Sequence, residues 1–127
     1  MQPRDASYLF DILDAARSAR DFVAGYDEDS FVADRKTQSA VIRELLIIGE
    51  ATKQVSPAYR DAHPQIPWRA MAGMRDVLVH NYRGTSLENV WIAVTESLPS
   101  LIAALAPLFP PEDIRIIEAG GGHHHDG

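Results

Sequence analysis

The chain has 127 residues, a formal net charge of −6 and no cysteine. Its length suits one compact domain, and 46% hydrophobic with 24% charged residues is typical of a globular protein. The lack of cysteine excludes disulfides and thiolate metal sites, and the negative charge argues against a broad basic surface for nucleic acid. We see neither an apolar signal segment nor an apolar run approaching membrane-spanning length, so we expect a cytoplasmic protein with no membrane contact.

Helical spacing of the apolar residues predicts four main helices, and no segment shows the alternation typical of a strand. The second helix is apolar around so much of its circumference that it should be central to the core. Asp5 can cap the first helix, and Pro99 should kink the last one or split it near Leu98, of which we prefer the kink. The predicted helices are, in chain order, about 5–25, 30–55, 67–81 and 86–105, with room for one helical turn between the second and the third. The predicted fold class is all-α.

The carboxyl-terminal part of the chain is expected to be a separate, flexible tail. We assign residues 1–118 to one helical domain and residues 119–127 to a tail rich in glycine and histidine. Three adjacent histidines at 123–125 can hold a transition metal loosely. A disordered end is the simpler interpretation, and we predict no metal site in this protein.

Residues 75–82 combine a permanent cation, an imidazole and a phenol in an otherwise apolar run. Such groups are costly in apolar surroundings unless they find partners or perform chemistry. Residues 53–83 also carry five basic and two acidic side chains, whereas the rest of the chain has a net charge of −9. This distribution favours a focused phosphate-binding site, although 31 residues can reach such an excess by chance.

The residue types in this segment match the needs of RNA cleavage without a metal. Histidine, with a pKa near 6.5, can act as a base or as an acid, and Arg75 offers a planar fork to phosphate oxygens. Asp76 can hold the His80 imidazole in a useful tautomer. On a straight helix Arg75 and His80 are about 140° apart, so they converge only if the helix ends early or a second protomer contributes. A two-fold dimer through this helix would gather two copies of each residue in one cleft.

Each of these residues also has an ordinary structural interpretation. Arg75 and Asp76 can form a weak surface pair, His80 can complement the helix dipole, and Tyr82 can be a core residue with a hydrated hydroxyl.

The Arg-x4-His-x-Tyr pattern of Arg75, His80 and Tyr82 resembles the signature of HEPN-domain proteins, and most closely the HepT-like toxins of toxin–antitoxin pairs. Residues 31–38, 47–51 and 66–68 are also similar, so the resemblance covers about residues 8–105. It implies an up-down bundle of four to five helices that forms a homodimer, with a metal-independent ribonuclease cleft between the protomers and no cofactor. By the same resemblance Arg75 and His80 are catalytic, and Asp76 supports them.

The resemblance also implies a partner, a nucleotidyltransferase antitoxin of the MNT type. Such a partner neutralises the toxin by transferring AMP from ATP onto Tyr82, and the added phosphate charge would occupy the cleft and repel RNA. The alternative is a catalytically weak binding module that restrains a toxic nucleotidyltransferase. The presence of both Arg75 and His80 favours the ribonuclease, because a scaffold needs neither. An unrelated helical regulator would require the helix over 67–81 to face solvent.

Weaker expectations concern residues outside the signature. Glu50 is either a helper that contacts Arg75 or His80, or a buried carboxylate paired with an arginine for structural reasons. Trp68 and Trp91 are expected to anchor the core or an interface rather than to stack on bases. Four further cations are either part of an RNA path or solvated surface charges: Lys53, Arg60, Arg69 and Arg83.

Overall fold

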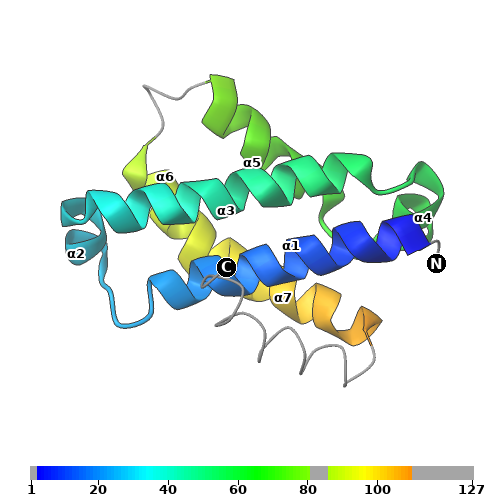
Figure 1. Cartoon of the computed structure of the whole chain (residues 1–127), viewed down its shortest axis with the longest axis horizontal. Coiled ribbons are helices and arrows are strands. Elements are labelled where there is room, and N and C mark those ends of the chain that lie inside the picture. The colour runs from blue at the N-terminus through cyan, green and yellow to red at the C-terminus, as the bar shows by residue number, and fades with distance from the viewer. Residues whose placement is uncertain (1–2, 81–85, 110–127) are drawn as a thin grey trace.

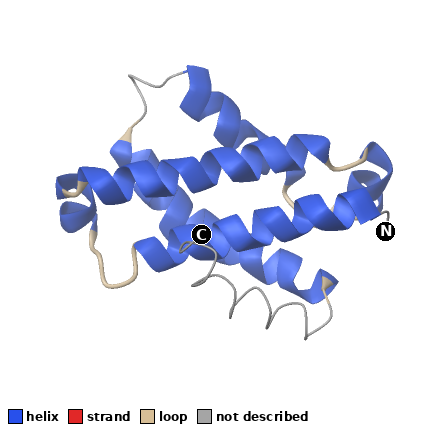
Figure 2. Ribbon diagram, in the orientation of Figure 1, coloured by secondary structure: helices blue, strands red, loops and turns tan. Residues whose placement is uncertain are grey.

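The structure is a computed structural model that describes residues 3–80 and 86–109, with the side chains of residues 76–80 left out of the description. All regular secondary structure within these residues is helical, which confirms the all-α prediction (Figure 2). The helices are α1 (Pro3–Phe22), α2 (Glu28–Ala33), α3 (Arg35–Gln54), α4 (Pro57–Ala62), α5 (Trp68–His80), α6 (Leu87–Ile92) and α7 (Leu98–Leu105). The proposed tail at 119–127 lies outside the described residues, so the domain boundary stays a prediction.

The two longest helices, α1 and α3, lie side by side and antiparallel at the centre of the molecule (Figure 1). Helix α5 packs on α3, and α7 packs on α1, so each central helix is covered by one outer helix. The core residues of α1, α3 and α7 recur at helical spacing and are buried: Leu9, Ile12, Ala16, Val41, Leu45, Ile48, Leu98, Leu101 and Leu105. Helix α3 therefore has the central position that its apolar sequence predicts.

The predicted single helix over 30–55 is wrong, because the chain breaks at Asp34 into α2 and α3. Asp34 has an extended backbone, and its carboxylate accepts hydrogen bonds from the Thr37 amide at 3.1 Å and from the Tyr26 hydroxyl at 2.6 Å. These bonds lower the pKa of Asp34 to about 2, and the bond from Tyr26 has the largest effect. A capping aspartate with its own tertiary partner therefore ends one helix and begins the next.

Asp5 does not cap the start of α1 as predicted; it lies inside the helix and is buried. Its carboxylate accepts hydrogen bonds from the backbone N–H of Ser56 at 2.8 Å and from the Ser56 hydroxyl at 2.7 Å. Both bonds hold the pKa of Asp5 below its usual value. Because Ser56 is the N-cap of α4, this contact ties α4 to the beginning of α1.

Helix α6 begins after the N-cap Ser86, and the chain stays helical from there to the end of α7 at Leu105. Pro99 therefore does not split this predicted helix. A π-helical segment, Ala93–Ser97, directly precedes the proline and accommodates its missing N–H and its ring. The expectation of no apolar run of membrane-spanning length is wrong here. The 22-residue stretch Leu87–Leu108 contains an 18-residue window with a mean hydropathy of 1.5, which is long and apolar enough to cross a membrane. The core helix of a globular protein can meet the same criterion, and α7 packs on α1.

Candidate functional site

Helix α5 meets α3 most closely where Arg75 faces Gly49. A Cβ atom at Gly49 would lie 2.8 Å from the Arg75 backbone nitrogen and closer still to the Arg75 Cβ, so even a methyl group does not fit. Glycine inside a helix costs about 1 kcal/mol relative to alanine. That cost is offset here by the close contact of the two helices. The contact sets the position of Arg75 on the surface of α3.

The side chain of Arg75 forms an ion pair across this helix contact. Its Nε lies 3.0 Å from Oε2 of Glu50, the residue that follows Gly49. The Arg75 side chain is 30% exposed and that of Glu50 is 58% exposed. The predicted contact between Glu50 and Arg75 is thus observed and the Glu50 carboxylate is not buried, while its role as a helper stays a prediction. An ion pair this exposed adds little to folding stability, so its main effect is to orient the guanidinium group.

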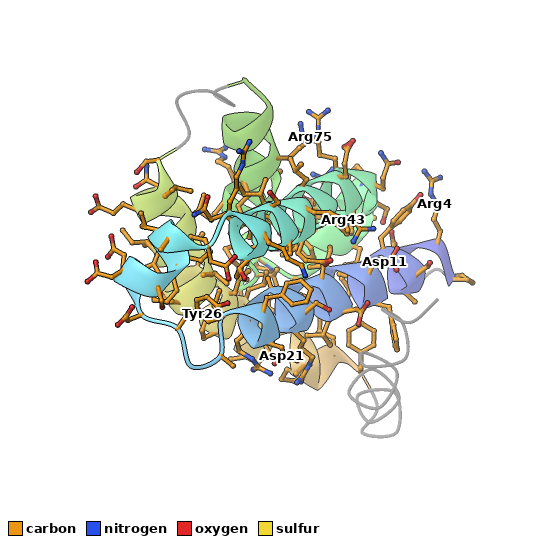
Figure 3. All side chains as sticks on the ribbon, turned by 60° about the vertical axis from the view of Figure 1, so that its left-hand side comes forward. Arg4, Asp11, Asp21, Tyr26, Arg43 and Arg75 are labelled. Carbon is orange, nitrogen blue, oxygen red and sulfur yellow. The ribbon has the colours of Figure 1, made fainter. Side chains whose placement is uncertain are left out.

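Arg75 projects from the α3–α5 side of the molecule, away from Arg43 and Asp11, which lie where α3 faces α1 (Figure 3). The guanidinium group is therefore presented at the surface while its stem rests on the neighbouring helix. A fixed, partly exposed guanidinium of this kind is suited to binding an oxyanion such as phosphate.

The other predicted site residues are only partly within the described structure. The backbone of α5 is helical through Asp76 and His80, although their side chains are not described. Tyr82 and Arg83 lie outside the described residues. Since α5 does not end before His80, the angle of about 140° between the Arg75 and His80 positions persists within one chain. An early end of the helix therefore does not bring Arg75 and His80 together within one chain, and a contribution from a second protomer is the remaining way.

Both tryptophans have packing roles, as predicted. The Trp68 indole N–H donates to the backbone oxygen of His63 at 2.9 Å, which holds the beginning of α5 on the segment after α4. Trp91 packs on Phe31 with a ring distance of 5.3 Å and so joins α6 to α2. These contacts hold the beginning of α5 and the carboxyl-terminal part of α6 against neighbouring segments.

Four of the described residues have a shifted pKa, namely Asp5, Asp27, Asp34 and Tyr59. Burial, helped by the negative charge of Asp5, raises the pKa of Tyr59 on α4, and the lowered pKa values belong to capping or buried aspartates. In residues 3–75 and 86–109, no three histidine or carboxylate side chains come together in a group that could hold a metal ion.

Comparison with known proteins places these features in a family. A family model described as ribonuclease HepT-like matches residues 12–108, which run from the middle of α1 to the end of the helical part. The chain belongs to the HepT-like family. The match includes all of α5, so the Arg75–His80 segment lies within the HepT-like region.

Two named relatives illustrate the similarity. A protein of Thermococcus cleftensis named probable ribonuclease HepT is 44% identical over 101 residues, covering 80% of this chain and 92% of the relative. A protein of Methanocaldococcus jannaschii, provisionally named an RNase, is 40% identical over 94 residues, covering 74% of this chain and 78% of the relative. Among solved structures, none matches this HepT-like chain.

Proposed function

We propose that this chain is a metal-independent endoribonuclease and the toxin of a toxin–antitoxin pair, acting in the cytoplasm. The observation that carries the proposal is the fixed guanidinium of Arg75, held by Glu50 at the surface of α5 in a chain of the HepT-like family. Arg75 and His80 are the proposed catalytic residues, and Asp76 is the proposed support for the imidazole.

The proposed reaction is attack by a ribose 2′-hydroxyl on the adjacent phosphodiester. One His80 imidazole accepts the 2′-hydroxyl proton, the new 2′-oxygen–phosphorus bond forms, and the bond to the 5′-oxygen breaks. A second, protonated His80 gives its proton to the leaving 5′-oxygen. Arg75 stabilises the extra negative charge on the phosphorus oxygens in the transition state, because its guanidinium stays protonated throughout.

A homodimer is the proposed active form. Within one chain Arg75 and His80 point to sides of α5 about 140° apart, so one helix alone does not surround a phosphate with both groups. A two-fold axis near α5 gathers two arginines and two histidines, and it supplies one histidine for each proton transfer.

The proposed partner is a nucleotidyltransferase antitoxin that transfers AMP from ATP onto Tyr82. Tyr82 lies two residues beyond His80 in the sequence, so an AMP group there brings a negative phosphate close to the proposed cleft. That charge competes with RNA for Arg75 and repels the substrate phosphates. Incubation with the partner and ATP should add the mass of AMP to Tyr82, and Tyr82→Phe should abolish the addition. Modification confined to other residues contradicts this mode of control.

Expression of the chain alone tests the ribonuclease. We expect growth arrest and cleavage of RNA by the purified protein, with cleavage unchanged by a chelator and lost in Arg75→Ala and His80→Ala. An RNA lacking 2′-hydroxyl groups should stay intact, because it has no attacking oxygen. If the intact chain neither arrests growth nor cleaves RNA, the alternative of a binding module that restrains a toxic nucleotidyltransferase is favoured.

A further inference from the structure

A second polar site lies between α4 and α5. A pocket of about 710 Å³ is lined by Arg60 on α4 and by Arg69 and Gly73 on α5. Pro57, Pro64 and Trp68 supply apolar walls, and Asp61 is the one carboxylate in the lining. The Trp68 ring is held in place by its hydrogen bond to His63. The volume lies in the range of pockets that hold small molecules or parts of larger ligands.

The guanidinium of Arg60 contains a polar atom that finds no partner in the described part of the chain. Its Nε is buried and has no hydrogen-bond partner among the described residues. A buried donor without a partner is costly, and native proteins usually provide one from protein, water or ligand. Because this Nε has almost no accessible surface, an anion in the pocket can accept a hydrogen bond from it only after the guanidinium turns toward the pocket.

Gly73 leaves the α5 side of the pocket without a side chain. A Cβ atom built at Gly73 would have no other atom within 4 Å, so packing inside this chain does not require glycine there. Glycine inside the helix nevertheless costs about 1 kcal/mol relative to alanine. Bare backbone at an open surface allows a ligand to approach closely.

The pocket lies on the side of α5 that carries the His80 position. Asp76 and His80 follow Gly73 by three and seven residues in one continuous helix, so the three positions share a side of the helix axis. Seven residues correspond to a rise of about 10 Å. A bound RNA chain that passes the His80 position therefore reaches the pocket within a few nucleotides.

The sign of the charge distinguishes this pocket from another on the molecule. The pocket between α1 and α3 is lined by Asp11, Glu50 and one arginine, Arg43. The α4–α5 pocket has two arginines and one carboxylate. Among the described lining residues, positive charge therefore exceeds negative charge only in the α4–α5 pocket, which favours a phosphate group there.

We propose that the α4–α5 pocket binds a phosphate group of the RNA substrate a few nucleotides from the cleaved bond, with Arg60 and Arg69 as its contacts. This inference rests on the proposed ribonuclease function and deepens it. The site positions RNA and takes no part in bond breaking.

Binding of a 2′-O-methyl RNA oligonucleotide, which the proposed mechanism cannot cleave, tests the site with the full-length protein. Arg60→Gln and Arg69→Gln should each weaken binding roughly three- to tenfold, the effect of losing one charged hydrogen bond at a partly exposed site. Each should also reduce the slope of log Kd against log salt by about 0.7, because one phosphate contact is lost. Arg20→Gln is the matched control, since Arg20 lies on α1 and its side chain is 43% exposed.

Gly73→Leu provides a second test that removes no charge. Its side chain has room in the free protein, so the thermal unfolding temperature should not fall, while RNA binding should weaken roughly tenfold because the pocket is filled. If Arg60→Gln and Arg69→Gln behave like Arg20→Gln, the inference is wrong while ribonuclease activity can stand. If the variants instead change the mass of the assembly in light scattering, the pocket is a protein interface and the inference is also wrong. Failure of the intact chain to cleave unmodified RNA overturns the proposed function itself.

Discussion

Helix α5 has a glycine next to each of its two sides, Gly49 of α3 on the packed side and its own Gly73 on the open side, and the two have opposite reasons. On the side that packs against α3, Gly49 is needed because a Cβ atom would overlap Arg75. On the side that faces the α4–α5 pocket, Gly73 has open space beside it. Both glycines have the same intrinsic cost in a helix. A helical glycine therefore indicates either close packing or an open surface, and only its spatial neighbours distinguish the two.

Arg75 and Arg60, which lie on these two sides of α5, also differ in their surroundings. Arg75 has a carboxylate partner in Glu50, so its direction is set before any ligand arrives. Arg60 has a buried Nε for which the described residues offer no acceptor. An ion pair suits an arginine that must be oriented for chemistry, whereas a donor without an acceptor suits an arginine that binds a ligand.

Gly49→Ala should have the largest effect on the free energy of unfolding, and it tests the side of α5 that packs on α3. The added methyl group overlaps the Arg75 backbone, so α5 must move away from α3, and the free energy of unfolding should fall by about 1–3 kcal/mol. Urea unfolding measures the change, and RNA cleavage should fall as Arg75 is displaced. An unfolding free energy equal to that of the natural chain would show that the two helices are not held this closely.

Gly73→Ala is the matched substitution on the open side and should have the opposite sign. The new methyl group meets no neighbour and removes the helix cost of glycine, so the free energy of unfolding should rise by up to about 1 kcal/mol. If this variant is destabilised as strongly as Gly49→Ala in the same urea titration, the surroundings of the two glycines do not differ as described.

Glu50→Gln should have the smallest effect on stability and sharpens the proposed role of the ion pair. Both side chains are partly exposed, so the unfolding free energy should change by less than about 1 kcal/mol. Cleavage should slow roughly three- to tenfold, mostly in kcat, because Arg75 is less well oriented. Asp21→Asn, which removes the exposed partner of Arg20, is the control and should leave cleavage unchanged. A large loss of stability in Glu50→Gln would instead identify the pair as structural.

Local sequence patterns predicted most of the helices and the segment that carries the candidate site. Apolar residues at helical spacing place α1, α5 and the last long helix, because each must bury one face. The break at Asp34 was missed, since its carboxylate bonds to Tyr26, which lies before α2. The role of Asp5 was missed for a similar reason, because its partner Ser56 is 51 residues away.

The candidate site was predicted by residue type, but most of its geometry was not. A contact of Glu50 with Arg75 or His80 was one of two interpretations of the sequence, and nothing in the spacing decided between them or indicated the close approach of Gly49 to Arg75. Their contact depends on how closely α3 and α5 approach, and that distance results from packing along both helices.

By itself, the sequence determined that this protein is all-helical and that Arg75 and His80 share one helix, because helical periodicity is a local property. Only the tertiary structure decided that Arg75 is oriented by Glu50, that Gly49 is indispensable for the contact, and that Arg60 and Arg69 border one pocket. Ion pairs, steric overlap and pockets arise between segments far apart in the chain, and their distances are set by packing of the whole bundle.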